Sequence, residues 1–317
     1  MKTGRIDLWK DGEYTYPLAF GFVPNMVTYL HDDDEVRPCM IVVPGGGYCM
    51  VSPTEGEIVA KKFYSFGYNA FVVTYTTNLL FKEPLKDQPM KDLSRAIRMV
   101  RKDAEKFCID SSKVTICGFS AGAHLCGSVC VHYSDVPDSD SELNTISNRP
   151  DAAILSYPVI TSGEFAHRDS FNALIGHDAS KEELEYYSLE KQVTKDTPPT
   201  FLWQTVPDET VPIENSYLYE EALRKEGVLH AHHVFSAGHH GLSLGDQDWS
   251  DHKFGEPYCM EQIMKICDAL RNDEVTVSPE KKEEVLRDWS EVHYWPDVTY
   301  PEIKLWPELA DAFLKTL

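Results

Sequence analysis

The sequence predicts an α/β protein in which helices cover both faces of a central, mostly parallel sheet. Short runs typical of strands alternate with helical patterns along most of the 317 residues, and a repeated strand–helix–strand order builds a parallel sheet. Several of these runs are continuously apolar, as expected for strands that are covered on both faces. With 42% hydrophobic residues the chain can bury one large core. We therefore expect residues 1–317 to form a single domain.

The predicted helices are marked by apolar residues at helical spacing and by end signals. Apolar residues from Leu93 to Ala104 form one buried stripe, and Ile213–Lys225 predicts a helix that Gly227 ends. Ser52–Glu55 has the residues of a capping box with proline at the first helical position, so a helix should start there. The predicted strands are Cys39–Val43, Ala70–Tyr75, Val114–Cys117, Ala152–Ser156, Phe201–Gln204 and His230–Phe235.

The alternation stops after Gly245. Residues 246–299 are acidic and predict two helices, Glu256–Arg271 and Pro279–Trp289, without a core strand, before a final amphipathic helix over Trp306–Leu317. We interpret this segment as an insertion that either caps the functional site, in a homodimer or alone, or packs as an extra helical layer. Aromatic residues are favoured at interfaces and against sugars. The aromatic residues of the segment are Trp249, Phe254, Tyr258, Trp289, Tyr294 and Trp295.

The charge and cysteine content narrow the partners. A net charge of −21 argues against a nucleic-acid partner and disfavours anionic membrane surfaces, so a neutral small substrate is expected. No apolar run approaches the roughly 20 residues that span a bilayer, and Met1–Asp11 lacks the apolar stretch of a secretory signal. Eight cysteines without CxxC pairs fit a reduced, cytoplasmic setting. The acidic run His31–Glu35 indicates a solvated turn rather than a metal site.

The run Gly118-Phe119-Ser120-Ala121-Gly122 matches G-x-S-x-G. Alone, such a match is weak, and Ser120 could be one serine in a loop of small residues. Here the motif follows a predicted strand and precedes a small-residue helix, which is the setting of a nucleophile elbow. The helix start also favours developing negative charge. We therefore interpret Ser120 as a nucleophile.

A triglycine run, Gly45–Gly47, follows the predicted strand that ends at Val43. Without Cβ atoms, its backbone N–H groups can point at an oxyanion. A flexible turn is the simpler alternative. A phosphate cradle is another, but the Lys-Ser/Thr of a P-loop is missing. Together with the Ser120 elbow, the run favours an oxyanion loop.

An acid and a base are expected after the serine, in the order Ser, Asp/Glu, His. Asp208 follows the strand Phe201–Gln204, at the carboxyl edge where functional residues of parallel sheets gather. Glu209 is adjacent but less well placed. His239 and His240 both follow the last strand, and spacing alone leaves the choice between them open.

Four stretches together resemble the α/β-hydrolase superfamily, specifically the acetyl esterase and acetylxylan-esterase-like group related to hormone-sensitive lipase. They are PGGGY, DSSKVTICGFSAGAHL, QTVPDETVPIENS and SAGHHGLSL, in the expected order. The resemblance implies Ser120 as nucleophile, Asp208 as acid and His240, rather than His239, as base. It also implies that the backbone N–H groups of Gly46, Gly47 and Ala121 form an oxyanion hole. Tyr48 is expected to contact the substrate.

The function implied is a serine carboxylesterase for short acyl (acetyl) esters, such as those of acetylated xylo-oligosaccharides, that works through an acyl-enzyme without a metal or organic cofactor. An arylformamidase or small-peptide hydrolase is the alternative on the same site. A non-catalytic binding module is a third possibility, but such modules usually lack part of the catalytic triad, and every part is present here.

Overall fold

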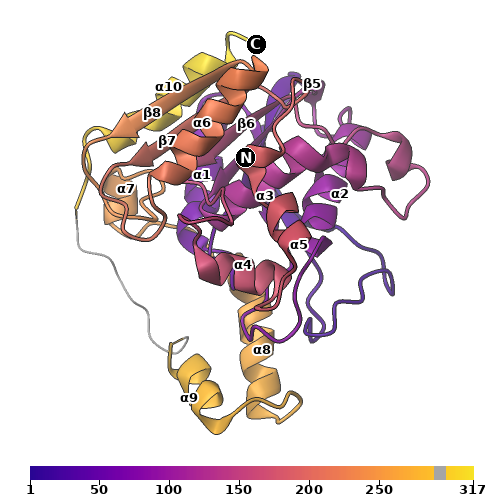
Figure 1. The fold of residues 1–317 in the computed structure, drawn as a ribbon. Helices are drawn as coiled ribbons and strands as arrows, with labels where there is room; N and C mark the ends of the chain where they lie inside the picture. Colours follow the sequence, from indigo (N-terminus) through magenta and orange to yellow (C-terminus); the bar gives the residue numbers. More distant parts are fainter. Residues whose placement is uncertain (289–297) are drawn as a thin grey trace.

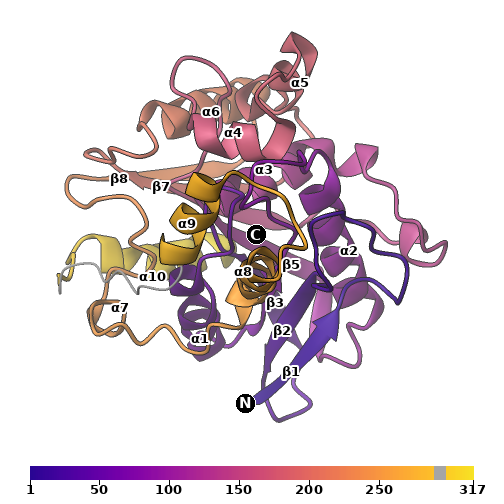
Figure 2. The same cartoon turned by 90° about the horizontal axis from the view of Figure 1, so that it is seen from below.

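An eight-stranded sheet forms the centre of the computed structural model, which describes residues 1–288 and 298–317 (Figure 1). Strand order is β1-β2-β4-β3-β5-β6-β7-β8, with β1 and β8 at the two edges (Figure 2). β3 to β8 are parallel, whereas β1–β2 and β2–β4 pair antiparallel. The strands are β1 (Lys2–Asp7), β2 (Asn25–Leu30), β3 (Arg37–Val43), β4 (Asn69–Thr74), β5 (Ile109–Phe119), β6 (Ala152–Ser156), β7 (Thr200–Thr205) and β8 (His230–Phe235).

The predicted mostly parallel sheet is confirmed, and its six predicted strands are β3 to β8. The sequence analysis missed β1 and β2. β1 has no apolar pattern to find, because KTGRID is largely exposed at the sheet edge. β2 lies inside the sheet, between β1 and β4, and most of its residues are buried.

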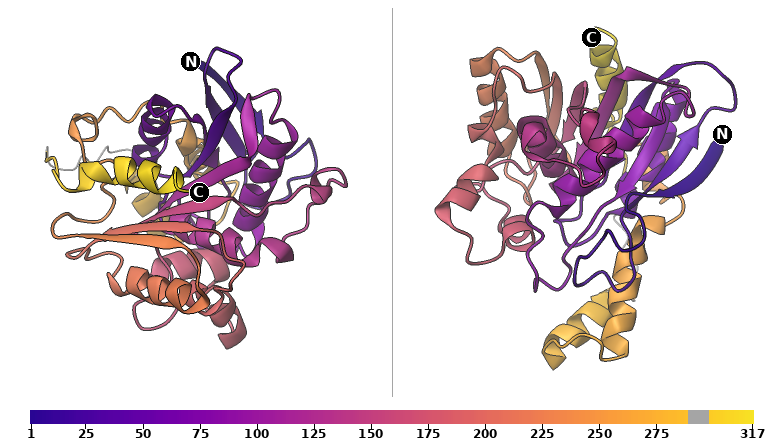
Figure 3. Two further views of the ribbon diagram at one scale, coloured as in Figure 1. Left: turned by 90° about the horizontal axis from the view of Figure 1, so that it is seen from above. Right: turned by 90° about the vertical axis from the view of Figure 1, so that its right-hand side faces the viewer.

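Helices cover both faces of the sheet (Figure 3). Alternate strand residues feed two separate cores: Ile41 and Val43 of β3 pack with α2, α3 and α6, while Met40 and Val42 pack with α1 and α10. This alternation follows from the period of two in a strand. The helices are α1 (Glu57–Ser65), α2 (Gln88–Lys102), α3 (Ala121–His132), α4 (Arg168–Ile175), α5 (Lys181–Tyr186), α6 (Glu214–Glu226), α7 (Gln247–Ser250), α8 (Glu261–Arg271), α9 (Pro279–Asp288) and α10 (Trp306–Leu314).

The predicted capping box at Ser52–Glu55 does not form. Residues 53–55 make a short 3-10 turn, α1 begins only at Glu57, and the Ser52 hydroxyl bonds Thr54 Oγ1 instead of a helix N–H. Glu55 turns inward and is only 3% exposed. The Glu55 carboxylate therefore accepts hydrogen bonds from distant residues instead of capping the helix start that the local pattern predicted. The predicted end of α6 is confirmed, because Gly227 adopts the left-handed conformation there.

The first part of the segment after β8 packs against the rest of the protein, and its later part projects outward. Trp249 is buried in the core beside α1 and α10, and the Gln262 amide exchanges hydrogen bonds with the backbone and hydroxyl of Thr77. Beyond these contacts α8 and α9 project as a helical pair (Figures 1 and 3). The predicted aromatic residues Trp289, Tyr294 and Trp295 lie outside the described residues. Among residues 1–288 and 298–317, no helix has both the length and the apolar character that a membrane span requires.

A close backbone contact joins the start of α3 to the end of β3. An ideal Cβ at Gly122 would lie 2.2 Å from Val43 O and 2.3 Å from Pro44 O, so any side chain there collides with rigid backbone. At Gly127, in the same helix, the first obstacle is Leu189 Cδ1, the far end of a flexible side chain.

We expect Gly122→Ala to destabilise the fold by about 1–3 kcal/mol, as overpacking does. It should also displace the residues that follow β3. Gly127→Ala is the matched control, since both changes gain the same helix propensity and only one meets backbone. Thermal unfolding measures both. Equal melting temperatures for the two variants would contradict the close approach.

Candidate active site

Ser120 occupies a strained turn between β5 and α3. β5 ends at Phe119 and α3 begins at Ala121, and Ser120 between them has φ 52° and ψ −118°, a conformation that non-glycine residues rarely adopt. Three backbone hydrogen bonds hold it: its N–H donates to Ser156 O, and its carbonyl accepts from His124 N and Val159 N. These hydrogen bonds offset the cost of the strained conformation. This geometry matches the predicted elbow.

The structure brings Ser120, His240 and Asp208 together. His240 Nε2 lies 2.8 Å from Ser120 Oγ, and His240 Nδ1 lies 2.7 Å from Asp208 Oδ2. Asp208 is an acceptor only, so we assign the imidazole proton to Nδ1, which leaves Nε2 free to accept the serine proton. The three residues come from loops at the carboxyl ends of β5, β7 and β8. In this arrangement His240 can take the serine proton while Asp208 orients the imidazole.

Backbone donors hold the Asp208 carboxylate in place. Its Oδ1 accepts from the N–H groups of Thr210 at 3.0 Å and Val211 at 2.9 Å, while Oδ2 faces His240. The Asp208 side chain is fully buried. The neighbouring Glu209 is exposed. Among the two acids that the sequence offered, only Asp208 reaches the imidazole.

His239 has other partners. Its Nδ1–H donates to His240 O at 2.6 Å, and its ring contacts those of Trp249 and Tyr300. Spacing alone did not distinguish the two histidines. In the structure it is His240 that reaches Ser120.

The glycine loop after β3 presents free donors. Gly46 and Gly47 adopt positive φ angles of 118° and 63°. Within residues 1–288 and 298–317, the N–H groups of Gly46, Gly47 and Ala121 donate to no protein group, whereas Gly45 N–H donates to Glu55. Three unpaired N–H groups beside a nucleophile can stabilise an oxyanion.

The structure corrects the prediction that Tyr48 contacts substrate. Tyr48 is 1% exposed, and its hydroxyl lies 2.8 Å from His124 Nδ1 inside the core formed by α2 and α3. Its positive φ of 60° continues the bend of the glycine loop and turns the ring inward. The tyrosine that closes PGGGY thus packs under the loop instead of lining an opening.

His167 is a site residue that the sequence analysis missed. It precedes α4, and its Cε1 lies 3.9 Å from where a Gly47 Cβ would be. Its Nδ1 is 2.8 Å from Ser170 Oγ. Burial, and secondly the nearby His240, lower the pKa of His167, so its neutral form is favoured. No local motif marks it, because only the fold brings α4 to the glycine loop.

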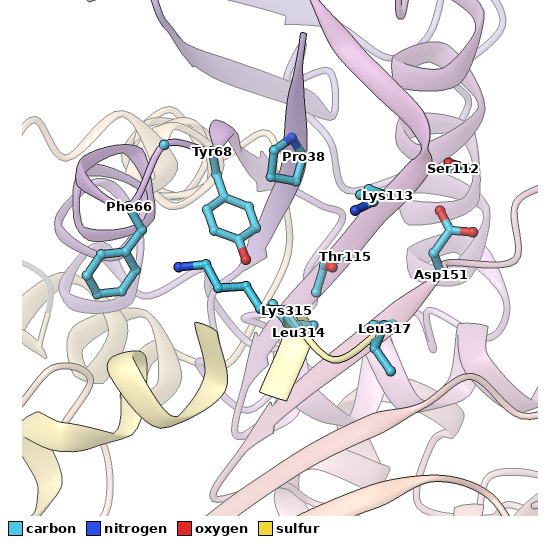
Figure 4. Close-up of a pocket in the computed structure, with 12 residues that line it drawn as sticks. Pro38, Phe66, Tyr68, Ser112, Lys113, Thr115, Asp151, Leu314, Lys315 and Leu317 are labelled. Atoms are coloured by element: carbon cyan, nitrogen blue, oxygen red, sulfur yellow. The ribbon is translucent and has the colours of Figure 1, made fainter. Parts of the chain in front are cut away.

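An open cavity of about 490 Å³ adjoins the triad and is lined by Pro207, Glu209, Thr210, Gly238, His239, His240 and Tyr300. A second cavity, of about 380 Å³, lies at the amino ends of β3, β5 and β6 (Figure 4). Tyr68, Lys113 and Lys315 line that one, at the opposite end of the strands from Ser120. Its position separates it from the chemistry. No cluster of three metal-ligating side chains occurs in the described parts of the chain.

Two curated proteins are similar to this chain over most of its length. Endo-1,4-beta-xylanase B of Butyrivibrio fibrisolvens is 50% identical over 265 residues, covering 84% of this chain and 42% of that protein. The acetylxylan esterase of Xylanibacter ruminicola is 30% identical over 241 residues, covering 74% and 46%. The chain therefore spans less than half the length of these curated relatives.

Among solved structures, the acetyl ester-xyloside bifunctional hydrolase of Caldicellulosiruptor lactoaceticus is similar with a TM-score of 0.71 and 38% identity, over 83% of this chain and 97% of that one. The sequence profile of the BD-FAE family matches residues 27–223, more than half of the chain. The predicted resemblance to α/β-hydrolases is confirmed. Because this profile matches more than half of its residues, the chain belongs to the BD-FAE family.

Proposed function

We propose that the protein is a serine carboxylesterase that removes short acyl groups, chiefly acetyl, from xylo-oligosaccharides. The observation that carries the proposal is the unbroken hydrogen-bonded chain from Ser120 Oγ through His240 to the buried Asp208. The named activities of an acetylxylan esterase and an acetyl ester-xyloside hydrolase among the relatives support the substrate class.

In the proposed mechanism, Ser120 Oγ attacks the ester carbonyl carbon while His240 Nε2 takes its proton. Asp208 stabilises the imidazolium that forms. The N–H groups of Gly46, Gly47 and Ala121 hold the negative oxygen of the tetrahedral intermediate. His240 then returns the proton to the leaving alcohol, which leaves an acyl group on Ser120. In the second half of the reaction, His240 takes a proton from water, which attacks the acyl carbon. His240 then returns the proton to Ser120 Oγ as the free acid leaves.

The cavity beside His240 suits the alcohol portion of such an ester. Its volume of about 490 Å³ falls in the usual range for small-ligand sites. Glu209 and Thr210 offer hydrogen-bonding groups to sugar hydroxyls, and the Tyr300 ring offers a face for a pyranose. A neutral saccharide also suits a chain of net charge −21, which disfavours polyanionic substrates and nucleic acids.

Ser120→Ala should abolish hydrolysis of p-nitrophenyl acetate while leaving thermal unfolding nearly unchanged, because the hydroxyl does chemistry and the elbow backbone stays. Losing a triad nucleophile costs about 10⁴–10⁶-fold in kcat. Initial rates and a melting curve provide the measurement. Activity above about a hundredth of wild type would contradict the nucleophile assignment.

Matched pairs test the base and the acid. His240→Ala should approach the serine variant, whereas His239→Ala should keep most of the activity, since only His240 reaches Ser120. Asp208→Asn should lower kcat by up to about 10⁴-fold through the wrong imidazole tautomer, and Glu209→Gln should not. The four kcat values with p-nitrophenyl acetate give the comparison. A reversed order within either pair would move the assignment by one residue.

A substrate panel tests the proposed class. kcat/KM should be higher for acetylated xylo-oligosaccharides and p-nitrophenyl acetate than for p-nitrophenyl octanoate or N-formylkynurenine. A preference for N-formylkynurenine would favour the arylformamidase alternative. Turnover of none of the four by the intact chain would contradict the esterase proposal as a whole.

A further inference from the structure

Glu55 is a buried carboxylate that the proposed mechanism does not use. It is 3% exposed, and in the described part of the chain no Lys, Arg or His lies within ion-pair distance of it. Two donors meet its two oxygens: Gly45 N–H at 2.7 Å on Oε2, and the Tyr157 hydroxyl at 2.6 Å on Oε1. Burial raises the pKa of Glu55. Burying a carboxyl group costs free energy, so a buried carboxyl group that the mechanism does not use calls for a structural reason. Its two hydrogen-bond partners indicate that reason.

The first contact lies in the oxyanion loop, which we define as Pro44–Tyr48. Gly45 N–H is the donor directly before the unpaired N–H groups of Gly46 and Gly47. An ideal Cβ on Gly45 would meet Phe119 O at 2.7 Å and Ser120 Cβ at 2.9 Å. Glu55 therefore holds the residue at which the oxyanion loop touches the elbow.

The second contact leads to the base loop, which we define as Gly238–Ser243. The Tyr157 hydroxyl accepts from Ser243 N–H at 3.1 Å, and its ring packs edge-on against His240 with centroids 4.8 Å apart. Ser243 O in turn accepts from Trp306 Nε1 at 2.9 Å. Tyr157 thus touches both the imidazole and the backbone three residues beyond it.

The direction of these hydrogen bonds follows from the number of donors. Gly45 N–H and Ser243 N–H can only donate, and Tyr157 has one hydroxyl hydrogen. Because a carboxylate can only accept, the Tyr157 hydrogen goes to Glu55 Oε1. The carboxylate then accepts at both oxygens, and the order runs from Ser243 through Tyr157 to Glu55, with Gly45 donating from the other side.

We infer that Glu55 and Tyr157 are positioning residues that set the spacing between the oxyanion loop and the base loop. Neither touches the reacting atoms. Together they connect a donor next to Gly46 with the loop that carries His240, so that the imidazole and the oxyanion donors face the same carbonyl group. The inference rests on the proposed function of Ser120 and His240.

Tyr157→Phe tests this spacing with the smallest change. It removes the hydroxyl and leaves the ring against His240 and Trp203. Since a displacement of about 1 Å can cost about 100-fold in rate, we expect kcat for p-nitrophenyl acetate to fall about 10–100-fold. KM should change by less than about threefold, because misplacement acts on the transition state.

Tyr68→Phe is the matched control. The Tyr68 hydroxyl also donates to a buried carboxylate, Asp311 Oδ1 at 3.1 Å, but at the amino ends of the strands (Figure 4). Both variants lose one tyrosine–carboxylate hydrogen bond, worth about 1.5–3 kcal/mol, and Tyr157→Phe also removes the acceptor of Ser243 N–H. Only Tyr157→Phe should lose kcat. An unchanged kcat in Tyr157→Phe, whatever the two melting shifts, would show a purely structural role and overturn the inference.

A double-variant cycle tests whether the two residues act as one unit. In Glu55→Gln the amide NH₂ must face Gly45 N–H or Tyr157, so one contact is lost. The variant carrying both substitutions should be no slower than the slower single variant. Multiplied effects on kcat would overturn the inference. If Glu55→Gln does not fold, the kcat and KM values of Tyr157→Phe against Tyr68→Phe still decide.

The outcomes separate this inference from the proposed function. If wild type hydrolyses p-nitrophenyl acetate and Ser120→Ala does not, while Tyr157→Phe keeps full kcat, only the positioning role fails. If Ser120→Ala keeps its activity, the proposed function fails, and the inference that depends on it fails with it.

Discussion

The close approach of α3 to the end of β3, where an ideal Cβ at residue 122 would lie 2.2 Å from Val43 O, holds Ser120 in its strained turn. A positive φ at serine is unfavourable unless its surroundings leave no alternative. Here Gly118 lets the backbone of Ala123 approach, and Gly122 lets β3 approach. In this position the Ser120 hydroxyl reaches His240 Nε2 at 2.8 Å.

The parallel sheet then determines which other residues can meet Ser120. Loops that leave the carboxyl ends of β3, β7 and β8 carry Gly46 and Gly47, Asp208, and His240, respectively. Neighbouring parallel strands end at one edge, so these groups converge although they lie far apart in the sequence. The projecting α8–α9 pair adds to this edge from one side, since Cys49 and Met50 pack with Ile263, Ile266 and Leu270.

Two buried carboxylates, Asp208 and Glu55, lie close to the imidazole of His240. Asp208 is stabilised by backbone N–H groups and by His240 itself, and Glu55 by Gly45 N–H and the Tyr157 hydroxyl. Hydrogen bonds to the charged form offset part of the desolvation cost. Fixed donors of this kind need no rearrangement when charge develops during the reaction. The site is therefore held by directional bonds rather than by mobile surface ion pairs.

From the sequence alone we predicted the parallel core, the turn at Ser120 and the glycine loop, and we favoured Asp208 over Glu209 as the acid, because each prediction depends on a local pattern of strand, turn and helix. It left His239 and His240 equivalent from spacing alone, and the resemblance to known esterases favoured His240. Only the tertiary structure showed which imidazole reaches Ser120, turned Tyr48 into the core and brought His167 to the glycine loop. It also showed that Glu55, which we predicted to cap a helix, lies instead between the oxyanion loop and Tyr157. A local pattern records which bonds a residue can make nearby, whereas burial decides which distant partner it must satisfy.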